Sequence, residues 1–174
     1  MTDRLITMAQ CSAAQHLAVE NMMAEQHCAA SHVEHRPSGA PYLATANNEP
    51  LDRHISISHT ANYLVMISGA SACGIDIEVI DRRVEHLASR FASSTEMTLA
   101  RQVIRSNPAL LVWCVKEALY KMFDRQGVDF LRDLCLVSRG ASAQILTAQA
   151  FGEQVDLQWQ IIETTDKILQ INTL

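Results

Sequence analysis

The sequence predicts an α+β domain in which antiparallel sheets carry a few helices. Short segments of alternating polar and apolar residues recur in both halves of the chain, which is typical of half-buried strands. Helical patterns lie between the two groups of strands, and this order favours the α+β class. Hydrophobic residues make up 48% of the 174 residues and charged residues 19%, so the chain can bury a core.

The first half of the chain is expected to hold one helix, one loop and three strands. The helix is predicted over residues 12–32, where apolar residues recur without Gly or Pro. Residues 35–50 are expected to form a loop because proline and glycine interrupt any regular pattern. Period-two alternation or a continuous apolar run predicts strands at residues 55–58, 63–67 and 75–79.

The second half is expected to hold three helices followed by four strands. Ser93 and Glu96 have the spacing of a capping box, and Pro108 suits the first turn of the last helix. The helices are predicted over residues 81–91, 94–104 and 109–123. The strands are predicted at residues 134–138, 144–147, 155–162 and 168–171.

Charge and cysteine content exclude several classes of protein. A net charge of −5 argues against a dedicated nucleic-acid binder, which is usually basic. The five cysteines are odd in number and lack CxxC spacing, which indicates reduced thiols in a cytoplasmic protein. No signal peptide is evident, and the longest apolar stretch, residues 63–77, is too interrupted to span a membrane.

Asp76 and Glu78 are the first candidate site residues. They lie two apart on a predicted strand, so both side chains point to the same face, with Cα atoms roughly 6.6 Å apart. Two carboxylates at this spacing can converge on one cation. The alternative is a half-exposed strand whose acidic residues simply face solvent.

The predicted helix over residues 109–123 adds Glu117 and Lys121 on one polar face, with Lys116 beside them. Alone, Glu117 and Lys121 could be an exposed pair worth a few tenths of a kcal/mol. If Glu117 meets the strand carboxylates around a phosphate, each pair of like charges at ~4 Å repels by about 4 kcal/mol at an effective dielectric of 20. Such a cluster needs a cation, and hard oxygen ligands select Mg²⁺ or Mn²⁺, with Lys116 or Lys121 completing the neutralisation.

Three weaker patterns remain. Ser58 and His59 end a predicted strand and could both donate to a phosphate oxygen. Cys28, His32 and His35 have spacings compatible with one helical face, but a zinc site needs a fourth ligand. A serine hydrolase is disfavoured because the chain has no G-x-S-x-G elbow.

Five short motifs together resemble the 4'-phosphopantetheinyl transferase superfamily, of the surfactin-synthetase-activating type. Their order and spacing are similar over about residues 36–137. The motifs are Gly39-Ala40-Pro41, Ser58-His59, Gly74-Ile75-Asp76-Ile77-Glu78, Arg90-Phe91 with Glu96, and Trp113 to Lys121.

The resemblance implies two related α+β halves about a pseudo-twofold axis, with coenzyme A in the cleft between them. The halves would be residues 1–72, which are abbreviated, and 73–174. The implied reaction moves the phosphopantetheine arm of coenzyme A to a serine of an acyl or peptidyl carrier protein and releases 3',5'-ADP. Arginines at positions 82, 83, 90, 101 and 105 could form a docking patch for an acidic carrier.

The resemblance also implies roles for individual residues. Asp76, Glu78 and Glu117 would hold Mg²⁺, with Mn²⁺ as the alternative. Glu117, or a water on the metal, would take the proton of the attacking serine. Contacts to the phosphates of coenzyme A would come from Arg36, Ser58, His59, Lys116 and Lys121.

Two departures from the family pattern keep alternatives open. Ala40 stands where the family often has a basic residue, and only about 72 residues precede Gly74. Either the first half is abbreviated, or a second subunit of a homo-oligomer completes the cleft. The competing hypotheses are a non-catalytic relative that binds coenzyme A or a carrier protein, and a different metal-dependent phosphoester enzyme.

Overall fold

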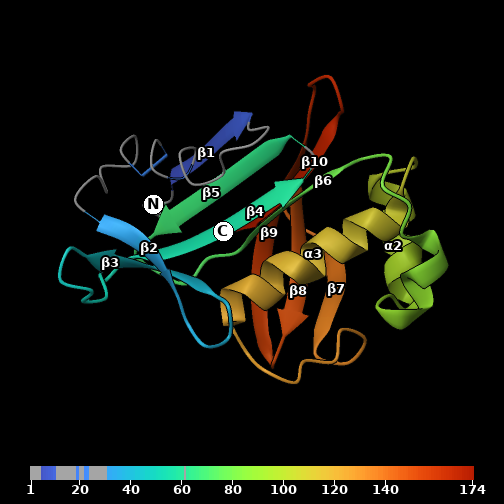
Figure 1. The fold of residues 1–174 in the computed structure, drawn as a ribbon. Coiled ribbons are helices and arrows are strands. Elements are labelled where there is room, and N and C mark those ends of the chain that lie inside the picture. The colour runs from blue at the N-terminus through green and yellow to red at the C-terminus, as the bar shows by residue number, and fades with distance from the viewer. Residues whose placement is uncertain (1–4, 11–18, 20–21, 24–30, 61) are drawn as a thin grey trace.

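The computed structural model describes residues 5–10, 19, 22–23, 31–60 and 62–174. Figure 1 shows three sheets with the long helix α3 lying across the largest of them. The strands are β1 (Leu5–Gln10), β2 (Ser31–His35), β3 (Pro41–Thr45), β4 (His54–Thr60), β5 (Tyr63–Gly69), β6 (Ile75–Val79), β7 (Leu134–Arg139), β8 (Ile145–Ala150), β9 (Glu153–Ile162) and β10 (Ile168–Thr173). The helices are η1 (Glu85–Arg90), α2 (Ser94–Val103) and α3 (Pro108–Phe123).

All described strand pairs are antiparallel, which confirms the α+β prediction. The five-stranded sheet has the order β6-β10-β9-β8-β7, and the three-stranded sheet has the order β1-β5-β4. Strands β2 and β3 form a separate hairpin. The division into halves at residue 72 stays a prediction, although no strand of the five-stranded sheet comes from before that residue.

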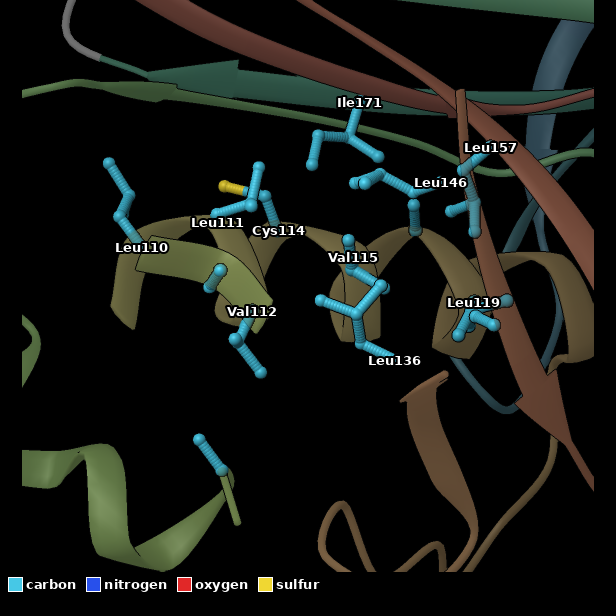
Figure 2. Packing of buried hydrophobic residues seen from close by; sticks show 14 of the residues in the cluster. Leu110, Leu111, Val112, Cys114, Val115, Leu119, Leu136, Leu146, Leu157 and Ile171 are labelled. Atoms are coloured by element: carbon cyan, nitrogen blue, oxygen red, sulfur yellow. The ribbon is translucent and has the colours of Figure 1, made fainter. Parts of the chain in front are cut away.

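Helix α3 provides much of the core. Asn107 caps it by accepting a bond from Leu110 N, and Pro108 occupies its first turn, where a missing N–H costs nothing. Its apolar side chains pack against the five-stranded sheet, and each fully buried Leu or Val contributes about 1.5–3 kcal/mol. Figure 2 shows this packing, which brings together Leu110, Leu111, Val112, Cys114, Val115 and Leu119 of α3 with Leu136, Leu146, Leu157 and Ile171 of the strands.

Two predicted elements match closely. Strand β6 has the predicted bounds, since strict alternation leaves one face apolar and one acidic. Helix α2 begins with the predicted capping box, in which the Ser93 side chain accepts from Glu96 N while Glu96 accepts from Ser93 N.

The loop predicted over residues 35–50 is wrong, because Pro41–Thr45 forms strand β3. The hairpin turns through residues 36–40, where Arg36 N donates to Ala40 O and Gly39 adopts a φ of 90°. The prolines and glycine of this segment predict an absence of regular structure, but in the fold they start a strand and close a turn.

The helix predicted over residues 81–91 is also wrong, since only the short 3₁₀-helix η1 forms there. The Asn107 side-chain amide donates to the carbonyls of Ile80 and Arg82, at 2.9 and 2.8 Å. These carbonyls are thereby satisfied from another element, and the chain enters η1 only at Glu85.

Most of the helix predicted over residues 12–32 lies outside the described residues. Within it, Val19, Met22 and Met23 are helical, whereas Ser31 and His32 belong to strand β2, so its predicted end is wrong. His32 and His35 lie three apart on a strand and therefore face opposite sides, and Cys28 is outside the described residues. No described helix is long and apolar enough to cross a membrane.

Candidate functional site

Strand β6 carries Asp76 and Glu78, and both carboxylates are buried, with 4% and 7% of each residue exposed. The prediction allowed for acidic residues in solvent, and the structure rules that alternative out. The strand pairs with β10 along one edge. Along its other edge it meets β4, whose Ser58 Oγ donates to Asp76 Oδ1 at 2.8 Å and whose Thr60 Oγ1 donates to Glu78 Oε2 at 3.1 Å.

Two cations of the chain itself neutralise these carboxylates. Lys121 Nζ of α3 lies 2.8 Å from Asp76 Oδ1 and also donates to Ile75 O at 3.1 Å. Arg82, four residues after Glu78, forms an ion pair with Glu78. Within the described part of the chain, the second Asp76 oxygen, Oδ2, is buried and has no hydrogen-bond partner. A buried oxygen in this state is costly unless a further ligand satisfies it.

Glu117 and Cys114 lie on the side of α3 that faces this group. Burial first, and then the negative charge of Asp76, raise the pKa of Glu117 above its usual range. The same two causes, in the same order, and then a hydrogen bond with the Asp76 side chain, raise the pKa of the Cys114 thiol well above its usual range. Glu117 is therefore electrostatically coupled to Asp76, as expected if the two share one site.

Gly74 makes the close approach between β6 and α3 possible. A Cβ atom at this position would lie 1.9 Å from the backbone oxygen of Ala118. Only glycine permits this contact, because real Cβ atoms do not come so near a carbonyl oxygen. The glycine that opens the Gly74–Glu78 motif thus brings Lys121 and Glu117 of the helix to the carboxylates of the strand.

Lys116 is placed elsewhere. Its side chain is fully buried, and its Nζ lies 2.8 Å from Glu96 Oε1 and 2.7 Å from Phe130 O. Glu96 also accepts hydrogen bonds from Leu136 N and from Ser93. Because this ammonium is enclosed and already paired, it is not available to the phosphates of a ligand, and the structure separates it from Lys121.

His59 and the Gly39–Pro41 turn line a cavity of about 310 Å³. Side chains alternate along a strand, so His59 faces this cavity while Ser58 faces Asp76. The two therefore do not face the same ligand group, contrary to the prediction from their shared position at a strand end. The cavity is lined by Val19, Val33, His35, Gly39, Pro41, Ile57, His59 and Leu64.

Arg36 is not among the residues that line the cavity. Its Nε lies 3.8 Å from Asp124 Oδ2, and its guanidinium lies 5.3 Å from the centre of the Tyr42 ring. Asp124 ends helix α3 just after Lys121, so Arg36 joins the β2–β3 hairpin to the end of α3 that bears the site. A role for Arg36 toward coenzyme A stays a prediction.

Sequence reasoning missed Thr60, Arg82 and His35. Thr60 follows Ser58 at strand spacing, so its contact with Glu78 could have been anticipated once β4 was placed beside β6. Arg82 was expected only in a docking patch for an acidic carrier. Its ion pair with Glu78 was not predicted, because the side chain of a residue on a predicted helix was not connected to the strand four residues before it. His35 was considered only as a zinc ligand, yet it lines the same cavity as His59.

The arrangement gathers charged groups of both signs at one place. Asp76 contacts Lys121, Glu78 contacts Arg82, and Glu117 lies near enough for the charge of Asp76 to raise its pKa. Carboxylate oxygens are the ligands that Mg²⁺ prefers. Among the described residues, however, no three His, Cys, Asp or Glu side chains are grouped closely enough to hold a metal ion as they stand. In this state Lys121 and Arg82 supply the positive charge.

A family model described as the 4'-phosphopantetheinyl transferase superfamily matches residues 72–171. This is more than half of the chain, and the matched segment includes β6, α3, β7, β8, β9 and the first four residues of β10. The chain belongs to this superfamily, whose members transfer phosphopantetheine from coenzyme A to carrier proteins. A comparison with curated proteins found no match.

Proposed function

We propose that this protein transfers the 4'-phosphopantetheine arm of coenzyme A to a serine of an apo acyl or peptidyl carrier protein and releases 3',5'-ADP. The observation that carries the proposal is the contact of Lys121 with Asp76 beside Glu78 and Glu117, within the segment that matches the superfamily. Family membership supplies the reaction class, and the site supplies residues of the chemistry that the reaction needs.

The residues fit a divalent cation by their chemistry. Asp76, Glu78 and Glu117 offer hard oxygen ligands, and Asp76 Oδ2 is a buried acceptor without a hydrogen-bond partner among the described residues. These three residues would hold Mg²⁺ or Mn²⁺. When bound, the cation would neutralise charge on the pyrophosphate of coenzyme A and help to orient it.

The chain's own residues then have distinct tasks. Lys121 Nζ, with 26% of its side chain exposed, would donate to a phosphate oxygen and offset charge that builds up during transfer. The serine Oγ of the carrier forms a new bond to the phosphorus that bears pantetheine, while the bond from that phosphorus to 3',5'-ADP breaks. Glu117 would take the proton of the serine, from its place beside Asp76.

The nucleotide portion of coenzyme A would occupy the cavity beside the β2–β3 hairpin. The cavity joins His59 to the Gly39–Pro41 turn, so two motifs far apart in sequence share one hollow. Its apolar side chains suit an adenine ring, and the imidazoles of His35 and His59 can donate to phosphate oxygens. Strand β4 carries His59 on this side and Ser58 toward Asp76, which connects the two parts of the proposed site.

A non-catalytic role is the second candidate. It is favoured by one observation: Lys121 and Arg82 already neutralise Asp76 and Glu78, so the fold does not need a metal to keep these carboxylates buried. Such a relative would bind coenzyme A or a carrier protein without transfer.

Mass spectrometry of an intact apo carrier protein, incubated with this protein, coenzyme A and Mg²⁺, separates the two candidates. We expect a gain of one phosphopantetheine that is lost with a chelator and falls by roughly a hundredfold or more in Asp76→Asn. Asp156→Asn is the matched control, since Asp156 also accepts a hydroxyl bond from a neighbouring strand, at 2.9 Å from Thr147, but lies outside the site. No gain across acyl and peptidyl carriers, with coenzyme A still bound, would favour the non-catalytic role.

A further inference from the structure

Strands β4 and β6 are joined by a row of hydroxyl groups. Three alternate residues of β4 accept a hydrogen bond from a backbone N–H of β6: Ser56 from Ile75 at 3.2 Å, Ser58 from Ile77 at 3.3 Å and Thr60 from Val79 at 3.4 Å. The backbone of β4 pairs with β5 and that of β6 pairs with β10. The hydroxyl row therefore occupies the position that a backbone ladder would fill between two adjacent strands.

Two of the three hydroxyls also contact the site. Ser58 donates to Asp76 and Thr60 donates to Glu78, in each case the residue just before the N–H from which the hydroxyl accepts. The equivalent residue for Ser56 is Gly74, which has no side chain. Ser56 therefore shares the strand-joining contact but has no carboxylate to hold.

A hydroxyl held at both ends fixes the carboxylate that it contacts. The hydroxyl oxygen accepts from a backbone N–H of β6, and the hydroxyl hydrogen is donated to one carboxylate oxygen. Ser58 is 6% exposed and Thr60 is 9% exposed, so water competes little for these bonds. For Asp76 the result is that Oδ1 is held by Ser58 and Lys121, while Oδ2 is left for another ligand.

We propose that Ser58 and Thr60 are positioning residues of the cation site, acting through Asp76 and Glu78 rather than by touching coenzyme A. The proposal deepens the function proposed above and rests on its assignment of these carboxylates to a divalent cation. The sequence predicted that Ser58 contacts a phosphate of coenzyme A, and the positioning role supersedes that prediction. Hydrogen-bond partners that orient metal ligands contribute strongly to metal affinity in other proteins.

A purely structural role is the competing explanation, because each hydroxyl also holds β4 against β6. The chain offers its own control, since Ser56→Ala removes a strand-joining hydroxyl without touching a carboxylate. Thr60→Val removes the hydroxyl at nearly constant shape, and Thr60→Ser restores it.

Titration calorimetry with Mn²⁺ alone, together with thermal unfolding, tests the proposal. We expect Ser58→Ala and Thr60→Val to weaken Mn²⁺ binding by roughly 10- to 100-fold, while Ser56→Ala and Thr60→Ser bind as the wild type does. A structural role predicts instead that Ser56→Ala and Ser58→Ala lower the melting temperature alike and leave Mn²⁺ affinity alike. If Ser58→Ala does not fold, the Mn²⁺ affinities of Thr60→Val and Thr60→Ser distinguish the positioning role from a purely structural one.

The outcomes separate this proposal from the proposed function. Equal Mn²⁺ affinity in Ser56→Ala and Ser58→Ala, or in Thr60→Val and Thr60→Ser, overturns the positioning role even if the wild type transfers phosphopantetheine. A wild type that binds no Mn²⁺ overturns it as well. A wild type that binds Mn²⁺ with the expected variant pattern but transfers nothing supports the positioning role and overturns the transferase.

Discussion

Glu117 links the stability of the protein to pH. Its pKa is raised above its usual value of 4.5, mainly by burial and then by the charge of Asp76. At pH values between the unfolded and folded pKa, the folded state binds more protons than the unfolded state. The free energy of unfolding therefore falls as pH rises through this interval, and ionised Glu117 lowers stability at neutral pH.

Glu117→Gln should therefore raise the melting temperature at pH 7 in metal-free protein and flatten the fall of stability above about pH 4.5. It should also abolish transfer, so that the variant gains stability at the expense of activity. Thermal unfolding across pH in the presence of a chelator measures the effect, with Glu163→Gln as a control at an exposed carboxylate. A lower melting temperature of Glu117→Gln at pH 7 would contradict the claim that ionised Glu117 destabilises the folded state.

Which residues of the site meet could be predicted only in part. The contact of Lys121 with Asp76 follows the predicted neutralisation of the strand carboxylates by a helix lysine. Lys116 could not be assigned in the same way, because helical spacing does not reveal that Glu96 on another helix encloses it. Alternation along a strand implies that Ser58 and His59 face opposite sides of β4. Spacing could not show what lies on each side, since the neighbours of β4 come from distant segments.

At the scale of elements, Gly74 sets the distance between β6 and α3. Gly74→Ala should push α3 away from the strand, with a loss of about 1–3 kcal/mol in the free energy of unfolding and weaker Mn²⁺ binding. The new Cβ would meet the backbone oxygen of Ala118, not its side chain. Ala118→Gly should therefore fail to rescue Gly74→Ala in urea unfolding, and a full rescue would show that the contact is misassigned.

The pair of Lys116 and Glu96 fixes α2 and α3 against β7. Lys116→Met leaves the Glu96 carboxylate buried without its cation, which should cost about 3–5 kcal/mol in urea unfolding. Lys167→Met is the control: Lys167 pairs with Glu163 at 3.7 Å on the surface, and its loss should cost less than about 1 kcal/mol. Equal costs for the two variants would mean that Glu96 finds a replacement partner when Lys116 is removed.

Elements with one strong local signal were predicted well, and elements shaped by distant contacts were not. Strand β6 has strict alternation and α2 has a capping box, so their own residues define them. The predicted helix over residues 81–91 gave way to η1, because Asn107 takes carbonyls that a helix would have used. That amide lies more than twenty residues along the chain, beyond any local pattern.

For the whole molecule, composition and the order of elements sufficed for the α+β class. The arrangement of sheets did not follow, because β6 joins its sheet through β10 while its other edge meets β4. Such pairings depend on contacts far apart in sequence, which periodicity does not report. The surfactin-synthetase-activating subtype, the abbreviated first half and the homo-oligomer stay predictions.

The pairing of β6 with β10 affects the order in which the protein folds while it is synthesised on the ribosome. Gly74 N donates to Thr173 Oγ1, a residue 99 positions along the chain. At translation rates of about 5–20 residues per second, roughly 5–20 s pass between the synthesis of the two partners. During this delay the acidic strand has emerged without its sheet, whereas α2 and α3 can already pack on each other. The carboxylates of Asp76 and Glu78 therefore reach their places only after β10 has been made, and translational arrest before residue 168 should yield a fragment with α2 and α3 but without the pairing of β6 with β10.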